Sequence, residues 1–326
     1  MKRRELLSSA AAVAAFIPFG GVAQPSQPMI GYLGIRSPET ETPLRAPFLE
    51  GLENAGFVDG RNVTIEYRFA EGRAERLPIL ANELIRLPVA VLIAPGVSAA
   101  IAAKNATSTI PIVFGVGGDP VQLGLVASLN RPAGNATGVY ALSTQLTSKR
   151  LEVLRELLPQ PGLIAVLFGP DTQIMRGEQR RELDAAAQAV GQPILVLQAQ
   201  DQDEVEKAFA MMAERGVGGL FFGLSAYFQV IADKLVALAA HHRIPALYEW
   251  REFVIAGGLI SYNGSRREGW LLAGDYAGRI LKGATPADLP VVQSTRFELV
   301  INLETAKALG LTIPHTVLLR ADEVIE

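Results

Sequence analysis

Cysteine is absent from the 326-residue sequence, and histidine occurs only three times. The lack of cysteine excludes a disulfide framework, a thiol nucleophile, a thiolate metal site and a lipid anchor carried on cysteine. The histidines, His241, His242 and His315, form no H-x-x-x-H pair, and no G-x-S-x-G nucleophile elbow occurs. We therefore expect no metal site and no catalytic residue.

Long runs of one charge are also missing, and the net charge is −3. This balance argues against a nucleic-acid partner and against a polybasic membrane patch. The sequence has no G-x-x-x-x-G-K-[ST] motif, and the glycine-rich stretch at 115–120 is not G-x-G-x-x-G, so we expect no cofactor. Hydrophobic residues make up 49% of the chain and charged residues 19%, which is ample for a folded core.

The N-terminal 23 residues have the pattern of a secretory signal peptide. Lys2, Arg3 and Arg4 precede a short apolar run from Ala10 to Phe19, and small residues follow up to Ala23. The arginine pair resembles a twin-arginine signal, but general secretory signals carry the same residue types, so both export routes stay open. No later stretch is long and apolar enough to span a bilayer. We expect a periplasmic protein that is not lipid-anchored.

Beyond residue 28, short apolar runs alternate with helical patterns, and the series then repeats. Strands are expected at 29–35, 62–69, 89–96 and 110–115, and again at 163–170, 193–198, 217–223 and 244–250. Corresponding strands lie about 130 residues apart, which indicates a duplication. Strands that are apolar on both faces and alternate with helices predict parallel sheets covered on both sides.

The sequence therefore predicts an α/β protein of two doubly wound parallel-sheet lobes. Further strands at 134–143 and before residue 265, a helix through 270–283 and a tail at 297–311 suggest that the chain crosses between the lobes more than once. We expect a multi-strand hinge, with lobe I formed by 28–142 plus 257–286 and lobe II by 143–256 plus 287–326.

Ligands of open parallel sheets lie beyond the carboxyl ends of the strands, so the loops there are the candidate site. In lobe I the loops of interest contain Gly96, Val97 and Ser98, and Gly117, Gly118 and Asp119. Asp119 precedes Pro120 and is expected to cap a helix over 119–130, while Ser98 is expected to cap the helix before it. Two helix N-termini with flanking glycines would accept a carboxylate, although such caps also occur where nothing binds.

In lobe II the corresponding loops are rich in aromatic residues. Tyr227, Tyr248 and Trp250 follow strands, as does Tyr140 in lobe I, and their polar ends favour a position at a cleft rim, with core packing as the alternative. Ser225 lies in the same group of loops. Glu249 is a candidate to hold an ammonium group.

Four segments then carry a resemblance to a known family: "GDPVQLGLVASLNRPAGNATGV", "KRLEVLRELLP", "IPALYEWREFVIAGGLISY" and "FELVINLETAKALGL". They resemble the ABC-transporter substrate-binding family that includes the streptococcal tryptophan-binding lipoprotein, and the likeness covers nearly all of 28–326. The resemblance implies a type I periplasmic-binding-protein fold with a three-crossover hinge. It implies a small-molecule ligand captured between the lobes and an ABC permease in the inner membrane as partner.

The resemblance also places the cleft loops at Ser37, Gly96–Ser98, Gly117–Asp119, Ser225–Tyr227 and Tyr248–Trp250. The tryptophan binder has Asp-Asn where this chain has Ser225 and Ala226, so an α-amino group need not be held in the same way. An amino acid and an aromatic or hydrophobic carboxylate both stay open as ligands. We expect a monomeric receptor; the alternative is an exported α/β enzyme that acts on a small carboxylic acid through Asp119 and Glu249.

Overall fold

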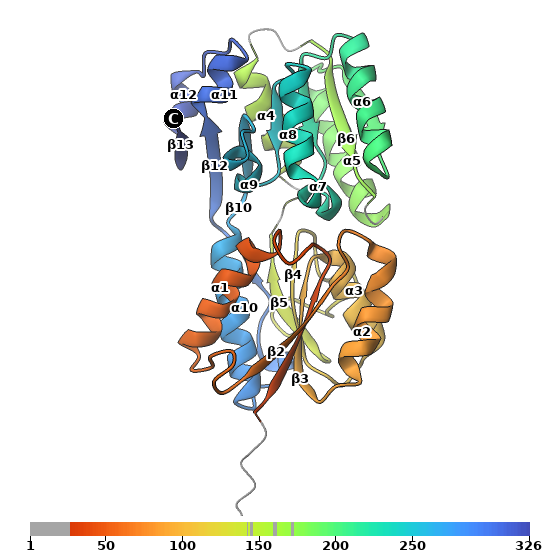
Figure 1. The fold of residues 1–326 in the computed structure, drawn as a ribbon, viewed down its shortest axis with the longest axis vertical. Coiled ribbons are helices and arrows are strands. Elements are labelled where there is room, and N and C mark those ends of the chain that lie inside the picture. Colours follow the sequence, from red (N-terminus) through yellow and green to blue (C-terminus); the bar gives the residue numbers. More distant parts are fainter. Residues whose placement is uncertain (1–26, 142, 144–145, 159–161, 171–172) are drawn as a thin grey trace, which may run out of the picture.

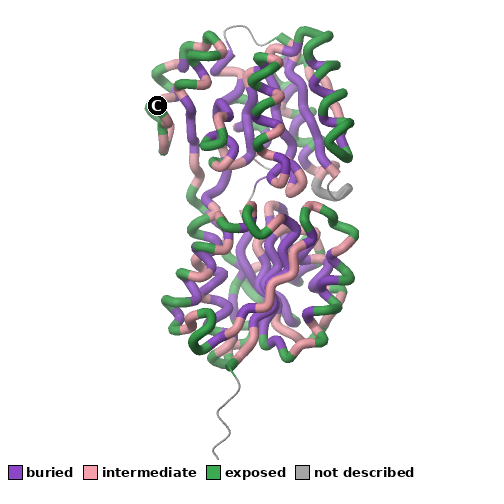
Figure 2. The backbone as a smooth tube through the Cα atoms, viewed as in Figure 1, coloured by how far each residue is buried: buried purple, intermediate pink, exposed green. Residues whose placement is uncertain are grey.

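The computed structural model describes residues 27–141, 143, 146–158, 162–170 and 173–326, so the predicted signal segment 1–23 lies outside the described residues. Two α/β lobes stand one above the other (Figure 1), and each is a mainly parallel sheet covered by helices on both faces. The burial pattern shows the sheets as the cores of both lobes (Figure 2). The predicted fold class is confirmed.

Lobe I contains a six-stranded parallel sheet in the order β11-β5-β4-β3-β1-β2. Its strands are β1 (Met29–Gly34), β2 (Thr64–Phe69), β3 (Val89–Pro95), β4 (Ile112–Val116), β5 (Ala136–Tyr140) and β11 (Val292–Gln293). Its helices are α1 (Thr42–Asn54), α2 (Leu77–Ile85), α3 (Val97–Ala106) and α10 (Arg266–Leu281), with short 3-10 turns at Ala74–Arg76 and Pro286–Asp288. One apolar cluster joins α1 and α10 to the sheet, and a second joins α2 and α3 to its other face.

Lobe II contains a seven-stranded sheet in the order β13-β12-β10-β9-β8-β6-β7. Its strands are β6 (Ile164–Phe168), β7 (Ile194–Gln198), β8 (Gly219–Phe222), β9 (Ala246–Tyr248), β10 (Ile260–Gly264), β12 (Phe297–Asn302) and β13 (Glu323–Ile325). Its helices are α4 (Thr147–Leu157), α5 (Gln173–Ala189), α6 (Gln202–Glu214), α7 (Ala226–Val230), α8 (Ala232–His241), α9 (Arg251–Ile255), α11 (Leu303–Ala308) and α12 (His315–Leu318). Only the pairing of β10 with β12 is antiparallel among the described strand pairs.

The sheet topology repeats between the lobes. The order β2-β1-β3-β4-β5 in lobe I corresponds to β7-β6-β8-β9-β10 in lobe II. The strands predicted at about 130-residue spacing therefore occupy equivalent places in two sheets, as expected for a duplicated unit. The equivalence matters for the site, because it brings the carboxyl ends of both sets of strands to the boundary between the lobes.

The chain passes between the lobes three times: after β5, between β10 and α10, and between β11 and β12. The segment 257–286, expected in lobe I, contains β10, which pairs with β9 and β12 in lobe II. The segment 287–326, expected in lobe II, contains β11, which pairs with β5 in lobe I. The second and third crossings thus lie some residues further along the chain than the boundaries expected from the sequence.

Helix α10 returns the chain to lobe I and packs against α1 at glycine positions. A Cβ atom on Gly51 would collide with the carbonyl group of Leu271, and one on Gly274 would collide with the carbonyl oxygen of Phe48. Only glycine permits such close backbone approach. The close packing fixes α10 in lobe I, and Arg266 at its first turn therefore projects at the lobe boundary.

One predicted helix is absent, because residues 119–130 form turns instead. The amide of Leu123 donates to the carbonyl of Asp119, and the amide of Leu125 donates to the carbonyl of Pro120. Between them, Gly124 adopts a left-handed φ of +70°. Leu125 and Val126 are buried, which explains the helix-like apolar pattern. Among the described helices, none combines the length and apolar character needed to cross a membrane.

Candidate functional site

A cleft of roughly 960 Å³, partly open to solvent, lies between the lobes where the carboxyl ends of both sheets meet. A cleft between two lobes is a usual place for a small-molecule site. Both lobes and all three crossings contribute to its walls. The lining residues are Ile35, Arg36, Leu44, Gly96, Val97, Ser98, Gly115, Val116, Gly117, Val139, Tyr140, Ala141, Ser143, Leu224, Ser225, Ala226, Gln229, Glu249, Trp250, Gly264, Ser265, Arg266, Gly269, Trp270 and Ser294.

The lobe I wall is built around the N-terminus of α3. Gly96 is the N-cap, with φ +96°, and no side chain caps the helix. Gly96, Val97 and Ser98 all line the cleft. Since the first amides of a helix have no intrahelical acceptor, this uncapped terminus presents N–H donors and the positive end of the helix dipole to a ligand. Ser98, expected as the cap, lies instead within the first turn.

The base of the same wall is apolar. A Cβ atom on Gly115 would lie 2.5 Å from the ring of Trp270, so glycine lets this ring lie directly under β4. Leu44, Val97 and Val116 add aliphatic surface. This part of the cleft suits the apolar portion of a ligand.

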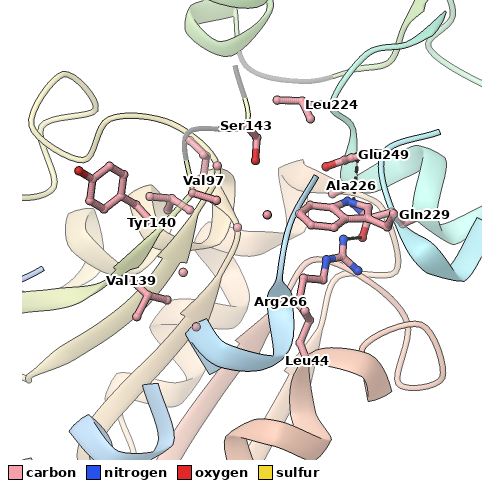
Figure 3. A pocket seen from close by; sticks show the side chains of 18 of the residues that line it. Leu44, Val97, Val139, Tyr140, Ser143, Leu224, Ala226, Gln229, Glu249 and Arg266 are labelled. Atoms are coloured by element: carbon pink, nitrogen blue, oxygen red, sulfur yellow. Dashed lines mark hydrogen bonds between the residues drawn. The ribbon is translucent and has the colours of Figure 1, made fainter. Parts of the chain in front are cut away.

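The lobe II wall presents ionisable and polar side chains. Glu249 follows β9, is only 6% exposed, and accepts from the backbone amide of Ser225 (3.3 Å) and from Gln229 Nε2 (3.4 Å). In Figure 3, Ala226, Gln229, Glu249 and Arg266 lie across the cavity from Val97 and Tyr140. The ends of a bound molecule would therefore meet different chemistry on the two sides.

The arginine side chains that line the cleft form ion pairs with other residues, so Glu249 has hydrogen bonds but no close counter-ion within the described part of the chain. Arg36 pairs with Glu41 at 3.4 Å and Arg266 pairs with Glu252 at 3.5 Å. Among the described residues, no side-chain cation lies within 4.0 Å of the Glu249 carboxylate. A buried carboxylate without a close counter-ion is costly, and a ligand cation would remove that cost.

The electrostatic surroundings of Glu249 act in opposite directions. Burial raises the pKa of Glu249, while the more distant guanidinium groups of Arg266, Arg150 and Arg36 lower it. Burial also lowers the pKa of Arg266 to about 10, and the guanidinium of Arg266 stacks 3.6 Å from the centroid of the Trp250 ring. Trp250 therefore lines the cleft and also makes a cation–π contact with Arg266.

The three crossings are hydrogen-bonded to one another beside the cleft. Ser143 Oγ donates to Asn263 Oδ1 at 3.0 Å, and Ser294 Oγ donates to the carbonyl of Ser265 at 3.3 Å. The amide of Ser294 donates to the carbonyl of Tyr140 at 2.8 Å. Ser143, Ser265 and Ser294 also line the cavity, so a ligand there would contact the hinge as well as both lobes.

Eight of the thirteen residues predicted from the sequence line this cleft, and they are Gly96, Val97, Ser98, Gly117, Tyr140, Ser225, Glu249 and Trp250. The other five lie outside its lining, and they are Ser37, Gly118, Asp119, Tyr227 and Tyr248.

Local geometry explains where these five residues lie. Ser37 Oγ contacts Thr40 in the turn before α1, and Asp119 accepts from the amide of Val121 at 2.8 Å. Gly118 is buried in the same turn as Asp119. Tyr227 faces Gly72 of lobe I, where an added Cβ would lie 3.7 Å from its ring.

Tyr248 is part of the lobe II core and not of an aromatic rim. It is 1% exposed and stacks with Phe222 and Phe253 at centroid distances of 5.0 and 5.1 Å. Side chains alternate along a strand, so Tyr248 and Glu249 face opposite directions. Burial raises the pKa of the Tyr248 hydroxyl strongly.

Sequence reasoning missed four prominent lining residues: Arg36, Gln229, Arg266 and Trp270. Arg36 directly follows the first strand and precedes the predicted Ser37, so the rule about carboxyl strand ends covers it. Gln229 lies one helical turn beyond Ser225, on the same helix face. Arg266 and Trp270 belong to α10, whose return to the cleft no local pattern reveals.

No group of three or more His, Asp or Glu side chains suited to a metal ion occurs in the part of the chain that the structure describes. The lining residues include three side chains of the acidic and basic types, Arg36, Glu249 and Arg266. The arrangement is therefore suited to holding a ligand by charge, hydrogen bonds and apolar contact.

The chain is similar to one protein family and to a curated protein. A family model described as ABC transporter substrate binding protein matches residues 40–325. A curated relative, the tyrosine-binding protein of Clostridioides difficile, is 26% identical over 265 residues, which are 81% of this chain and 75% of that protein.

Two solved structures are similar over almost their whole length. A conserved domain protein from Vibrio cholerae is 27% identical with a TM-score of 0.82, covering 91% of this chain and 99% of that one. An ABC domain from Streptococcus pneumoniae in complex with L-Trp is 25% identical with a TM-score of 0.83, covering 92% of this chain and all of that one (100%). Two lobes in the same arrangement are therefore shared with a ligand-bound protein.

Proposed function

Because this chain belongs to the family of ABC transporter substrate-binding proteins, we propose that it is the receptor of an ABC importer for an α-amino acid with an aromatic or apolar side chain. The observation that carries this proposal is the buried Glu249, which lines the cleft without a side-chain cation within 4.0 Å among the described residues. An ammonium group of the ligand would supply the missing charge.

The opposite wall suits the other end of such a ligand. The uncapped N-terminus of α3 offers amides of Val97 and Ser98 to a carboxylate. The side chain would then lie over the apolar surface formed by Leu44, Val116 and Trp270. The relatives named for tyrosine and crystallised with L-Trp support an aromatic amino acid over a plain carboxylic acid.

Ligand contacts to both walls would favour the closed arrangement of the lobes, because each wall alone satisfies only one end of the ligand. The closed receptor would then deliver its ligand to an ABC permease. We propose that it does so as a monomer, and that an N-terminal signal delivers it to the periplasm without a lipid anchor. Fractionation of cells and the mass of the purified mature protein test this location.

The alternative of an exported enzyme acting on a small acid receives less support. It needs a nucleophile or an acid/base pair in the cleft, for which only Asp119 and Glu249 are candidates, and of these two only Glu249 is among the residues that line the cleft. Asp119 instead accepts hydrogen bonds from the amides of Val121 and Gln122 in its own turn. We therefore propose that the cleft binds its ligand without chemical conversion.

Isothermal titration calorimetry with three matched compounds tests the proposal. L-tryptophan carries both charged groups, indole-3-propionate lacks the amine, and tryptamine lacks the carboxylate; tyrosine, phenylalanine and leucine extend the panel. We expect the complete amino acid to bind most tightly. Equal binding of indole-3-propionate would contradict the role of Glu249, and a panel without any binder would contradict the receptor function.

A further inference from the structure

We propose that Gln229 is a positioning residue that couples ligand capture at Glu249 to closure of the lobes; this deepens the proposed function and rests on it. Gln229 lies on α7 and is 8% exposed. Its Oε1 atom accepts from Arg36 Nε and from Arg266 Nη2, both at 2.6 Å. Its Nε2 atom donates to Glu249 Oε2 at 3.4 Å and to the carbonyl of Ser225 at 3.3 Å.

The two bonds to Oε1 cross the lobe boundary in different places. Arg36 follows β1 in lobe I, far along the chain from any crossing, whereas Arg266 comes directly after the crossing residue Ser265. A residue next to a hinge moves little when the hinge opens. Opening therefore breaks the bond between Arg36 and Gln229, while the contact of Arg266 with lobe II is retained.

The network around Arg36 prepares it for this contact. Arg36 is 6% exposed and is held by Glu41, which is fully buried and also accepts from the Tyr32 hydroxyl at 3.1 Å. Tyr32, Arg36 and Glu41 all belong to lobe I, so the guanidinium stays in place whether or not Gln229 is present. Gln229 is thus the lobe II side of the contact, and its amide also orients the carboxylate that receives the ligand.

The side-chain amide of Gln229 is uncharged, and this property affects how the lobes close. A carboxylate at this position would attract both guanidinium groups and hold the lobes together without a ligand. It would also lie next to Glu249, and two adjacent carboxylates do not both ionise. Glutamine avoids both effects, so closure is left to the ligand.

The first experiment is small-angle X-ray scattering on ligand-free wild type, Gln229→Glu and Gln229→Met, with the exposed Gln188→Met as the matched control. We expect Gln229→Glu to have a smaller radius of gyration than Gln229→Met, and the control to match wild type. Equal radii for the two Gln229 variants overturn the proposal. This comparison needs no ligand, so it stands even if the proposed amino acid ligand is wrong.

The second experiment uses stopped-flow binding of L-tryptophan to Gln229→Met, Arg36→Met and the double variant. Loss of the contact should raise the dissociation rate roughly tenfold with little change in the association rate. The double variant should lose less than the sum of the two single variants, because both single changes remove the contact between Arg36 and Gln229. Additive effects, or an unchanged dissociation rate in Gln229→Met with binding intact, overturn the coupling.

Discussion

The two lobes have the same strand order, yet their walls of the cleft are chemically different. In lobe I the helix after β3 has Gly96 as its N-cap and no side-chain cap. In lobe II the helix after β8 has Ser225 as its N-cap; the Oγ atom of Ser225 accepts from the amide of Phe228, and its own amide donates to Glu249. The same structural position is left open in one lobe and satisfied internally in the other.

Because of this difference, two lobes of the same topology attract opposite charges at the two walls of the cleft. Lobe I presents backbone amides, which attract an anion, and lobe II presents a buried carboxylate, which attracts a cation. Under the proposed function, a zwitterionic ligand would turn its carboxylate to lobe I and its ammonium group to lobe II. Mutations that neutralise one wall at a time separate these contributions.

The largest effect is expected from Glu249→Gln, which keeps the shape of the side chain and removes its charge. An ammonium ligand should bind roughly 100-fold more weakly, about 3 kcal/mol, because a buried charge pair loses one partner. Calorimetry with L-tryptophan measures the change, and the exposed Glu214→Gln is the control. If indole-3-propionate loses as much affinity as L-tryptophan, the effect does not arise from the amine.

A smaller effect is expected from Val97→Pro in the opposite wall. Proline is tolerated at the first position of a helix but removes one amide donor from the cleft. Affinity for L-tryptophan should fall about tenfold, about 1.5 kcal/mol, with little change in melting temperature. Val97→Ala keeps the amide and shortens the side chain, so equal losses in both variants would assign the effect to apolar contact.

The stability of the protein should depend on pH through Glu249 in the lobe II wall. Burial raises the pKa of Glu249 above its ordinary value of 4.5, with Arg266, Arg150 and Arg36 opposing the rise. The folded protein then holds this proton more tightly than the unfolded chain. The resulting stabilisation is complete below the ordinary pKa and is lost as the pH rises through the raised one.

Ligand binding should follow the opposite trend, because an ammonium group needs the ionised carboxylate. Affinity should decrease as the pH falls below the raised pKa, and binding there should release up to one proton. Calorimetry in two buffers of different ionisation enthalpy measures this release. Glu249→Gln should abolish it, and a release that persists in this variant would assign the proton to another group.

The smallest effect on binding is expected from Asp119→Ala. Its carboxylate accepts from the amides of Val121 and Gln122, so the variant should lose about 1 kcal/mol of stability. Affinity for L-tryptophan should stay within twofold of wild type, as for the milder Asp119→Asn. Urea denaturation measures the loss of stability, and calorimetry measures the affinity. A tenfold loss of affinity would indicate that Asp119 contributes to the binding site.

The fold was accessible from the sequence because strand and helix patterns are local and the duplication doubled the signal. The sequence predicts a helix over 119–130 where turns form, because Asp119-Pro120 can begin either structure and Leu125 is buried as it would be in a helix. Placement of Tyr248 at the rim overlooked side-chain alternation in a strand of three residues.

The candidate site was accessible in part for a related reason. Gly96 and Glu249 follow strands directly, so a general rule about sheet edges finds them. Arg266 and Trp270 reach the cleft only because α10 packs on α1 through Gly51 and Gly274, some 220 residues apart in the chain. Contacts of that kind are set by tertiary packing, which no window of sequence contains.

The interleaved path of the chain also has a consequence for how the protein is made. The face of α1 that packs on α10 stays uncovered until residues 266–281 have been synthesised, and β11 must follow before the edge of β5 is paired. Lobe I cannot complete itself first, although N-terminal units generally fold first during synthesis. In a newly made polypeptide, lobe I would therefore stay unfinished until β11 at residues 292–293 has been synthesised.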